Sequence, residues 1–152
     1  MKIHTDDLRG PEIAALLQGH LDHMRTLSPP GTVNALDLES LRVPEVTFWT
    51  VWEGANLLGC GALKELDRTF AEIKSMCTVR EHRGRGVGGR LVRHILDVAR
   101  DRGYRRVSLE TGTHMEFQSA HRLYKKFGFD YCTAFADYSL TPHNVCMTLE
   151  LL

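Results

Sequence analysis

Glycine and arginine are concentrated in one short stretch of the sequence, Val79-Arg-Glu-His-Arg-Gly-Arg-Gly-Val-Gly-Gly-Arg90. Glycine has no Cβ, so its backbone approaches a ligand closely and adopts a positive φ at little cost. An amphipathic helical pattern follows, and the start of a helix points unpaired N–H groups at the same place. Arg83, Arg85 and Arg90 add positive charge. The stretch therefore predicts a phosphate or pyrophosphate site, with a glycine-rich turn carrying solvated arginines as the alternative.

Two other phosphate-binding patterns fit this stretch less well. A Walker A loop requires Gly-Lys-Ser/Thr, whereas the sequence has Gly89-Arg90-Leu91. The dinucleotide fingerprint G-x-G-x-x-G is matched by Gly84, Gly86 and Gly89, with Glu110 about twenty residues further on. However, four charged residues separate the preceding strand pattern from the glycines, and the chain after Glu110 is too short for the rest of a doubly wound sheet. An NAD-binding oxidoreductase is therefore kept only as an alternative.

The elements around this loop are predicted from hydrophobic periodicity and from breakers such as Ser28-Pro29-Pro30-Gly31. Antiparallel strands come first, followed by strand–helix–strand–helix–strand, which predicts one α/β domain over residues 1–152 with a mixed sheet. The expected helices cover residues 11–25, 87–102 and 119–127, with a short helical segment at 35–41; the expected strands cover 46–52, 57–66, 71–79, 105–110, 129–133 and 145–151.

Composition indicates an ordinary globular protein and argues against several classes. The 152 residues are 43% hydrophobic, and 19 basic residues balance 19 acidic ones. A nucleic-acid or membrane-surface protein usually has a basic excess, and no apolar run approaches the ~20 residues that span a bilayer. The polar N-terminus lacks the apolar stretch of a secretory signal. Cys60, Cys77, Cys132 and Cys146 show no CxxC or metal spacing, so we expect reduced thiols, no metal and a cytoplasmic location.

Two motifs resemble those of the GNAT superfamily, the Gcn5-related N-acetyltransferases. Arg83-x-x-Gly86-x-Gly88 resembles its Q/R-x-x-G-x-G/A signature, and Leu123-Tyr-Lys-Lys-Phe-Gly-Phe129 resembles its LYxxxGF segment. The order of elements extends the resemblance over nearly the whole chain. The segments 72–76, 109–112 and 135–138 further resemble a bacterial subgroup of small uncharacterised GNAT proteins.

The resemblance implies a mostly antiparallel sheet with a central parallel strand pair splayed for acyl-CoA and helices on both faces. It implies that acetyl-CoA binds with its pyrophosphate on the glycine loop, its pantetheine along the preceding strand, and its thioester carbonyl at a backbone N–H near Val79. The cofactor-binding residues carried over in this way are Cys77, Thr78, Val79, Arg83, Gly84, Arg85, Gly86, Val87, Gly88 and Gly89.

The catalytic residues implied by the resemblance are Tyr124, Glu72 and Glu110. Tyr124 aligns with the usual general acid, which would donate a proton to the departing thiolate; its alternative role is packing on the apolar helix face. The base is left open between Glu72, Glu110 and His114. For Glu72 the chief alternative is a salt bridge with Lys74, which lies on the same side of its strand.

One position departs from the family pattern. Many relatives carry Asn seven residues before the tyrosine, whereas this chain has Phe117, which we expect to pack beneath the helix or against the pantetheine. Ser119 is a candidate N-cap or polar contact. Residues 28–34 and 135–138, together with Trp49 and Trp52, are candidates for lining the acceptor pocket, with the protein core or a dimer surface as the alternative for the tryptophans.

These observations predict an N-acetyltransferase that moves an acetyl group from acetyl-CoA to the primary amine of a small molecule or amino acid derivative by direct attack. The expected partner is the small-molecule amine, without nucleic acid, membrane or metal, and a homodimer is left open. An acyl-CoA-binding module without turnover is the main alternative.

Overall fold

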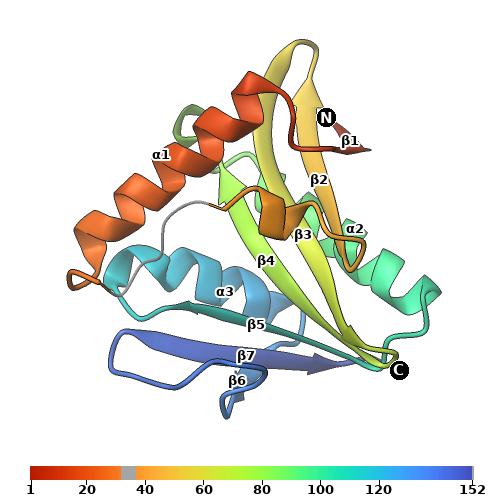
Figure 1. Cartoon of the computed structure of the whole chain (residues 1–152), viewed down its shortest axis with the longest axis vertical. Helices are drawn as coiled ribbons and strands as arrows, with labels where there is room; N and C mark the ends of the chain where they lie inside the picture. Colours follow the sequence, from red (N-terminus) through yellow and green to blue (C-terminus); the bar gives the residue numbers. More distant parts are fainter. Residues whose placement is uncertain (32–36, 152) are drawn as a thin grey trace. The chain divides into compact units, whose positions relative to one another are not determined.

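The sheet topology follows the predicted mixed α/β class. The computed structural model describes residues 1–31 and 37–151. Seven strands form one sheet in the order β1-β2-β3-β4-β5-β7-β6 (Figure 1). The strands are β1 Lys2–Thr5, β2 Val46–Glu53, β3 Asn56–Asp67, β4 Phe70–Thr78, β5 Arg106–Gly112, β6 Asp130–Cys132 and β7 Asn144–Glu150; the α-helices are α1 Pro11–Leu27, α2 Val87–Asp101 and α3 Gln118–Lys126.

The predicted parallel strand pair is β4 with β5, where Phe70–Glu72 lie beside Arg106–Ser108. The pairs β1–β2, β5–β7 and β6–β7 are antiparallel. By its contacts the chain divides into two compact units, Met1–Ala62 with Ser75–Leu91 and Leu63–Lys74 with Val92–Leu152. The strands β3 and β4 and helix α2 contribute residues to both units, and each unit is described by itself below.

The first unit is built on α1 and the N-terminal strands. Pro11 occupies the first helical position, where its missing N–H costs nothing, and α1 ends before Ser28-Pro29-Pro30. Ile13 and Leu17 lie one turn apart and are buried in a cluster with Leu8, Leu41, Phe48, Cys60 and Ala62. This apolar stripe explains why the predicted helix forms.

One strand of the first unit has no signal in the sequence. The residues of β1 are mostly exposed, and they pair with β2 in antiparallel register, Lys2 opposite Trp52 and Thr5 opposite Trp49. An exposed edge strand needs no apolar alternation, because its neighbour supplies the hydrogen bonds.

Of the segment predicted to be helical at 35–41, residues 35 and 36 lie outside the described part of the chain, and Glu39–Leu41 form a 3-10 turn.

One residue of β4 departs from regular strand geometry, and one glycine of β3 allows a close approach of neighbouring elements. Ser75 in β4 has φ 57°, and its carbonyl accepts a hydrogen bond from the thiol of Cys60 at 3.3 Å. A left-handed residue inside a strand is typical of a β-bulge. At Gly59 in β3, a Cβ would lie 2.8 Å from the carbonyl oxygen of Cys77 and 2.9 Å from a methyl group of Val87. Gly59 therefore allows β4 and the start of α2 to approach β3 closely.

The second unit contains the C-terminal strands, and Figure 1 shows β5, β7 and β6 side by side. Val107 and Leu109 of β5 are buried, and Gly103 (φ 85°) and Gly128 (φ 98°) end α2 and α3 as predicted. The expected N-cap at Ser119 is wrong, because α3 already begins at Gln118 and its N-cap position is Phe117.

No helix in the described ranges is both long enough and apolar enough to cross a membrane.

Candidate active site

The glycine loop of the first unit adopts the conformation that its composition predicts. Gly84 and Gly86 have φ 78° and 82°, and a Cβ on either would meet no atom within 4 Å. Glycine is therefore required here by the backbone angle rather than by lack of space. Helix α2 begins at Val87, and the Arg90 N–H donates to the Gly86 carbonyl at 3.1 Å. The N–H groups of the residues between them have no acceptor inside the helix.

The arginines of the loop have different surroundings. Arg85 donates to both carboxylate oxygens of Glu53, at 3.0 and 2.8 Å, and this contact lowers the pKa of Glu53. Arg90 donates to the carbonyl oxygen of Met1 at 3.0 Å. Arg83 is exposed, and across the described residues it forms no ion pair. Of the three arginines that the sequence predicts to add positive charge here, Arg85 has its charge balanced by Glu53.

The strand that leads into the loop narrows the choice of backbone N–H near Val79. The N–H of Val79 donates to the carbonyl of Leu58 at 2.8 Å, so this particular group is already used within the sheet. Consecutive N–H groups of a strand point to opposite sides. The nearest N–H that this alternation turns away from β3 is that of Thr78.

All four cysteines are free, and their thiols are held neutral. Burial raises the pKa of Cys77 to about 11 and raises the pKa values of Cys60, Cys132 and Cys146 as well. A neutral thiol is a poor nucleophile. Within residues 1–31 and 37–151, no group of three or more potential metal-ligating side chains is found.

Glu72 of β4 is the most deeply buried carboxylate of the second unit, with 3% of its surface exposed. The hydroxyl of Tyr138 donates to Oε2 of Glu72 at 2.5 Å, and the Lys74 ammonium lies 3.8 Å from the same oxygen. Burial raises the pKa of Glu72, whereas the Tyr138 hydrogen bond and the charge of Lys74 oppose this rise. The predicted ion pair with Lys74 is thus present, but the shorter contact is the one to Tyr138.

The two carboxylate oxygens of Glu72 differ in their surroundings. Both contacts fall on Oε2, and Oε1 has no hydrogen-bond partner in the described structure. In this part of the chain, no fully buried side-chain nitrogen or oxygen lacks a hydrogen-bond partner. Oε1 must therefore be touched by solvent. One oxygen of a buried carboxylate is held while the other is accessible, which is the arrangement that a general base needs.

The other two candidate bases are engaged differently. Glu110 is half-buried, and its Oε2 accepts a 3.1 Å hydrogen bond from the side-chain amide of Asn144. The exposed ring of His114 accepts the N–H of Glu116 at 3.1 Å and caps a short 3-10 turn, Met115–Phe117. The structure thus gives His114 a local capping role and leaves Glu110 as the second candidate for the general base.

Tyr124 lies on the buried side of α3, with 6% of its surface exposed. Its ring packs edge-on against Phe129, with 5.7 Å between centroids, and burial raises its pKa above the ordinary value. A tyrosine in this state remains protonated at neutral pH, so packing and a role as proton donor are compatible.

His121, for which the sequence predicted no role, and Phe117 hold the start of α3 against the sheet. The buried His121 lies 2.9 Å from the carbonyl oxygen of Gly112 through Nε2 and 3.1 Å from the Tyr131 hydroxyl through Nδ1. A carbonyl only accepts, so Nε2 carries the proton in the neutral ring. The ring of Phe117 also lies against Gly112. Of the two expectations for Phe117, packing within the protein is what the structure describes.

Comparison with known proteins places these features in one family. The sequence profile of the acetyltransferase (GNAT) family matches residues 14–129. The uncharacterised N-acetyltransferase YsnE of Bacillus subtilis (strain 168) is 50% identical over 151 residues, which are 99% of this chain and 100% of YsnE. The uncharacterised N-acetyltransferase YedL of Escherichia coli (strain K12) is 50% identical over 149 residues, which are 98% of this chain and 94% of YedL.

Solved structures share the fold. A Klebsiella pneumoniae protein classed as an acyl-CoA N-acyltransferase superposes with a TM-score of 0.79 at 26% identity, over 99% of this chain and 97% of its own. A GNAT acetyltransferase of Elizabethkingia anophelis with acetyl-CoA bound gives 0.73 at 18% identity over 99% and 97%, a likeness of fold alone. Because the family profile covers most of the chain and both bacterial relatives match nearly its whole length, the chain belongs to the acetyltransferase (GNAT) family and is an acyltransferase.

Proposed function

We propose that the protein transfers an acetyl group from acetyl-CoA to the primary amine of a small molecule or amino acid derivative, by direct attack of the amine. The observation that carries this proposal is Glu72, a buried carboxylate with one oxygen held and the other accessible, in a chain of the GNAT family. A primary amine with a pKa of ~10 is protonated at neutral pH and must lose a proton before it can attack.

The glycine loop fits the pyrophosphate of acetyl-CoA. Its two positive φ angles and the start of α2 direct backbone N–H groups outward, and the exposed Arg83 adds a cation. Bound acetyl-CoA supplies the activated acyl group as a thioester. The residues that would hold it are those named from the sequence, Cys77, Thr78, Val79, Arg83, Gly84, Arg85, Gly86, Val87, Gly88 and Gly89.

In this proposal Glu72 is the general base. Its Oε1 accepts a proton from the ammonium group of the acceptor, and its raised pKa makes it a stronger base than an ordinary glutamate. The neutral nitrogen then forms a bond to the acyl carbon, and the carbon–sulfur bond breaks. Glu110, with one oxygen held by Asn144, is the second candidate for the base.

Tyr124 is the proposed general acid. The departing thiolate takes a proton from the phenol, because a thiol with a pKa of ~8.5 retains a proton at neutral pH. Burial keeps the phenol protonated until that step. The nitrogen thus loses two protons, one to Glu72 before the attack and one to water as the tetrahedral intermediate collapses to the amide, while Tyr124 gives one proton to sulfur. Water then takes the proton from Glu72 and returns one to Tyr124, so one proton is released overall.

The protein's own thiols do not support a covalent acyl-cysteine route. The pKa values of all four cysteines are raised, so the thiolate needed to attack a thioester is scarce at neutral pH. Four free thiols also accord with the cytoplasmic location that we propose.

Calorimetry with acetyl-CoA, CoA and NADH, followed by thiol release against a panel of primary amines, tests the proposal. We expect binding of both coenzyme A species, no binding of NADH, and release of CoA with at least one amine. Tight NADH binding without acetyl-CoA binding would overturn the acetyltransferase assignment for this chain. Binding without turnover on any amine would favour the silent binding module.

A matched pair of variants tests the loop itself. Gly86→Ala introduces a Cβ at φ 82°, and Gly103→Ala introduces one at φ 85° at the end of α2, both in open space. The two should lose similar stability, about 1–2 kcal/mol. Only Gly86→Ala should weaken acetyl-CoA binding, by about tenfold. Equal affinity in the two variants would contradict a role of the loop in binding.

A further inference from the structure

We propose that Tyr138 is a positioning residue for acetyl transfer: it holds Oε2 of Glu72, so that Oε1 is presented to the amine that loses its proton. This inference rests on the proposed function and deepens it, since it names the group that orients the base. Tyr138 lies in the segment between β6 and β7, 66 positions from Glu72, and its hydroxyl donates to Oε2 at 2.5 Å.

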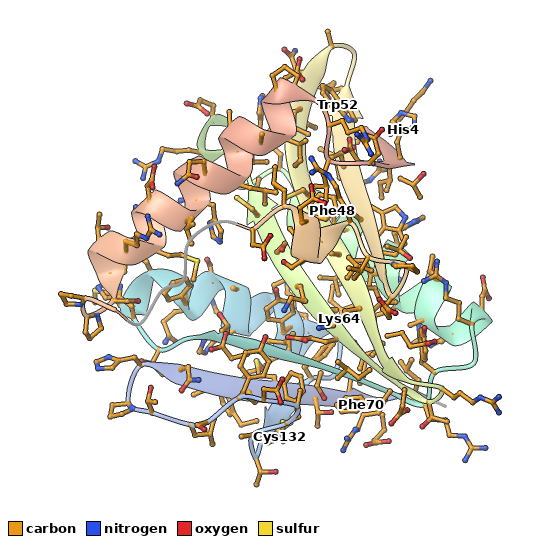
Figure 2. The ribbon with its side chains drawn as sticks, viewed as in Figure 1. His4, Phe48, Trp52, Lys64, Phe70 and Cys132 are labelled. Carbon is orange, nitrogen blue, oxygen red and sulfur yellow. The ribbon has the colours of Figure 1, made fainter. Side chains whose placement is uncertain are left out.

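A row of aromatic rings fixes the place of the Tyr138 hydroxyl. The ring of Tyr138 is 5.1 Å from that of the buried Phe135, which lies 5.7 Å from Phe70 at the start of β4, labelled in Figure 2. The guanidinium of Arg106 lies 3.9 Å from the centre of the Phe70 ring. Packed rings lose little freedom when they bind a partner, because each has only two side-chain torsions. The hydroxyl is therefore held by these tilted and edge-on ring contacts as well as by the loop backbone.

The direction of the hydrogen bond is set by Lys74. Its ammonium lies 3.5 Å from the Tyr138 hydroxyl oxygen, and an ammonium only donates. The hydroxyl oxygen thus accepts from Lys74 while its proton is given to Glu72. A donor polarised by a neighbouring cation makes a stronger hydrogen bond to a carboxylate. Lys74, Tyr138 and Glu72 form a directed chain that ends on Oε2 and leaves Oε1 accessible.

The charges around Glu72 show what loss of the hydroxyl should do. Lys74 on its own strand and Lys64 on β3 favour the carboxylate, as does the Tyr138 hydroxyl. Burial and Glu110 on β5 favour the neutral acid, and the buried thiol of Cys146 on β7 stays neutral. Removing the hydroxyl deletes one of the groups that stabilise the ionised form. The pKa of Glu72 should then rise, and its orientation should loosen.

Tyr138→Phe is the test, because it keeps the ring packed against Phe135 and removes only the hydroxyl. Its matched control is Tyr104→Phe, since the Tyr104 hydroxyl donates to Glu65 at 2.6 Å in the same unit. The Glu72 side-chain carboxyl is followed by ¹³C NMR as the pH is varied. In Tyr138→Phe we expect its titration to move to higher pH, and in Tyr104→Phe to stay where it is in the wild type. An unmoved Glu72 titration in Tyr138→Phe would overturn the proposal.

Kinetics with an amine identified by the panel supply the second readout. In Tyr138→Phe, kcat should fall about tenfold, the loss of ~1.4 kcal/mol that one hydrogen bond to a charged group is worth, while the KM for acetyl-CoA is unchanged. The acid limb of the pH profile should move upward with the NMR titration. Loss confined to KM, with an unmoved acid limb, would contradict a positioning role.

The failure of this inference can be told from failure of the proposed function. If the wild type binds acetyl-CoA but acetylates no amine, the proposed function is wrong, and the NMR titration still decides whether Tyr138 holds the carboxylate. Lys74→Met offers a second variant should Tyr138→Phe not fold. It removes the cation that donates to the Tyr138 hydroxyl, so it should also raise the pKa of Glu72. An unchanged pKa of Glu72 in Lys74→Met would count against the directed series of hydrogen bonds from Lys74 through Tyr138 to Glu72.

Discussion

The ring of Phe117 lies against Gly112 so closely that a Cβ on Gly112 would stand 2.5 Å from Cε2 of the ring. Gly112 ends β5, and its carbonyl is also bound by His121 of α3. Gly112 is thus the point at which the segment carrying Tyr124 meets the sheet. The phenylalanine that replaces the family's usual asparagine is a packing residue at this junction.

Gly112→Ala should therefore destabilise the fold. The new methyl group must displace an aromatic ring, an overpacking that costs about 1–3 kcal/mol in the free energy of unfolding. Urea denaturation measures it, and Gly112→Ala combined with Phe117→Leu should recover part of the loss. Gly19→Ala is the control, because nothing lies within 4 Å of its Cβ position in α1. That change should stabilise the protein by about 0.5–1 kcal/mol. Equal stability of both alanine variants would contradict the contact.

Glu72→Gln should make the protein less active but more stable at neutral pH. A carboxyl whose folded pKa is raised favours folding at low pH and disfavours it as the pH rises from the unfolded value of ~4.3 through the folded one. Glutamine cannot ionise, so the variant should lose this part of the pH dependence. Thermal unfolding between pH 4 and 8 measures it. A variant less stable than the wild type across that whole range would contradict the sign.

The same titration should appear in the rate. Glu72 accepts a proton only when ionised, so kcat/KM should rise with pH through its raised pKa, and the acid limb should lie above that of an ordinary glutamate. Glu110→Gln is the comparison. This change removes a negative charge near Glu72, so the acid limb should move to lower pH and should not disappear. If Glu110→Gln abolishes the limb while Glu72→Gln leaves it, the base is Glu110.

Tyr124→Phe should lower kcat by about 10²-fold or more, the range expected for loss of a general acid. Because burial raises the pKa of this phenol, the wild type should show no loss of activity attributable to Tyr124 up to about pH 10, the ordinary tyrosine value. Stopped assays of CoA release over pH 6–10 test both statements. Undiminished turnover at saturating substrates would leave Tyr124 with packing alone.

Arg83→Ala should weaken acetyl-CoA binding more than Arg85→Ala. Arg83 is exposed, whereas the guanidinium of Arg85 is bound to Glu53 by two hydrogen bonds. A cation that must leave a carboxylate gains less from a phosphate. We expect about tenfold loss for Arg83→Ala and a shallower dependence of affinity on salt. The reverse order by calorimetry would show that Arg85 exchanges Glu53 for the coenzyme.

The glycine loop and the ends of the helices could be predicted from local sequence. The angles at Gly84 and Gly86, the start of α2 and the ends of α2 and α3 at glycine depend on a few neighbouring residues, so composition and spacing were sufficient. The family resemblance of the two motifs likewise follows from short segments. The error at Ser119 arose because α3 begins at Gln118, one residue before the expected start.

The contact between Tyr138 and Glu72 depends on the tertiary structure. From the sequence, Glu72 is a candidate base and residues 135–138 are candidates for lining the acceptor pocket, but no periodicity relates Tyr138 to a carboxylate 66 positions away. Strand pairing, ring packing and burial bring Tyr138 and Glu72 together, and the fold likewise brings Glu53 to Arg85 across 32 positions. Backbone propensity acts over a few residues, whereas desolvation and side-chain pairing act between strands. Local sequence was therefore sufficient to predict the glycine loop and the helix that follows it, whereas the folded sheet sets which oxygen of Glu72 remains accessible.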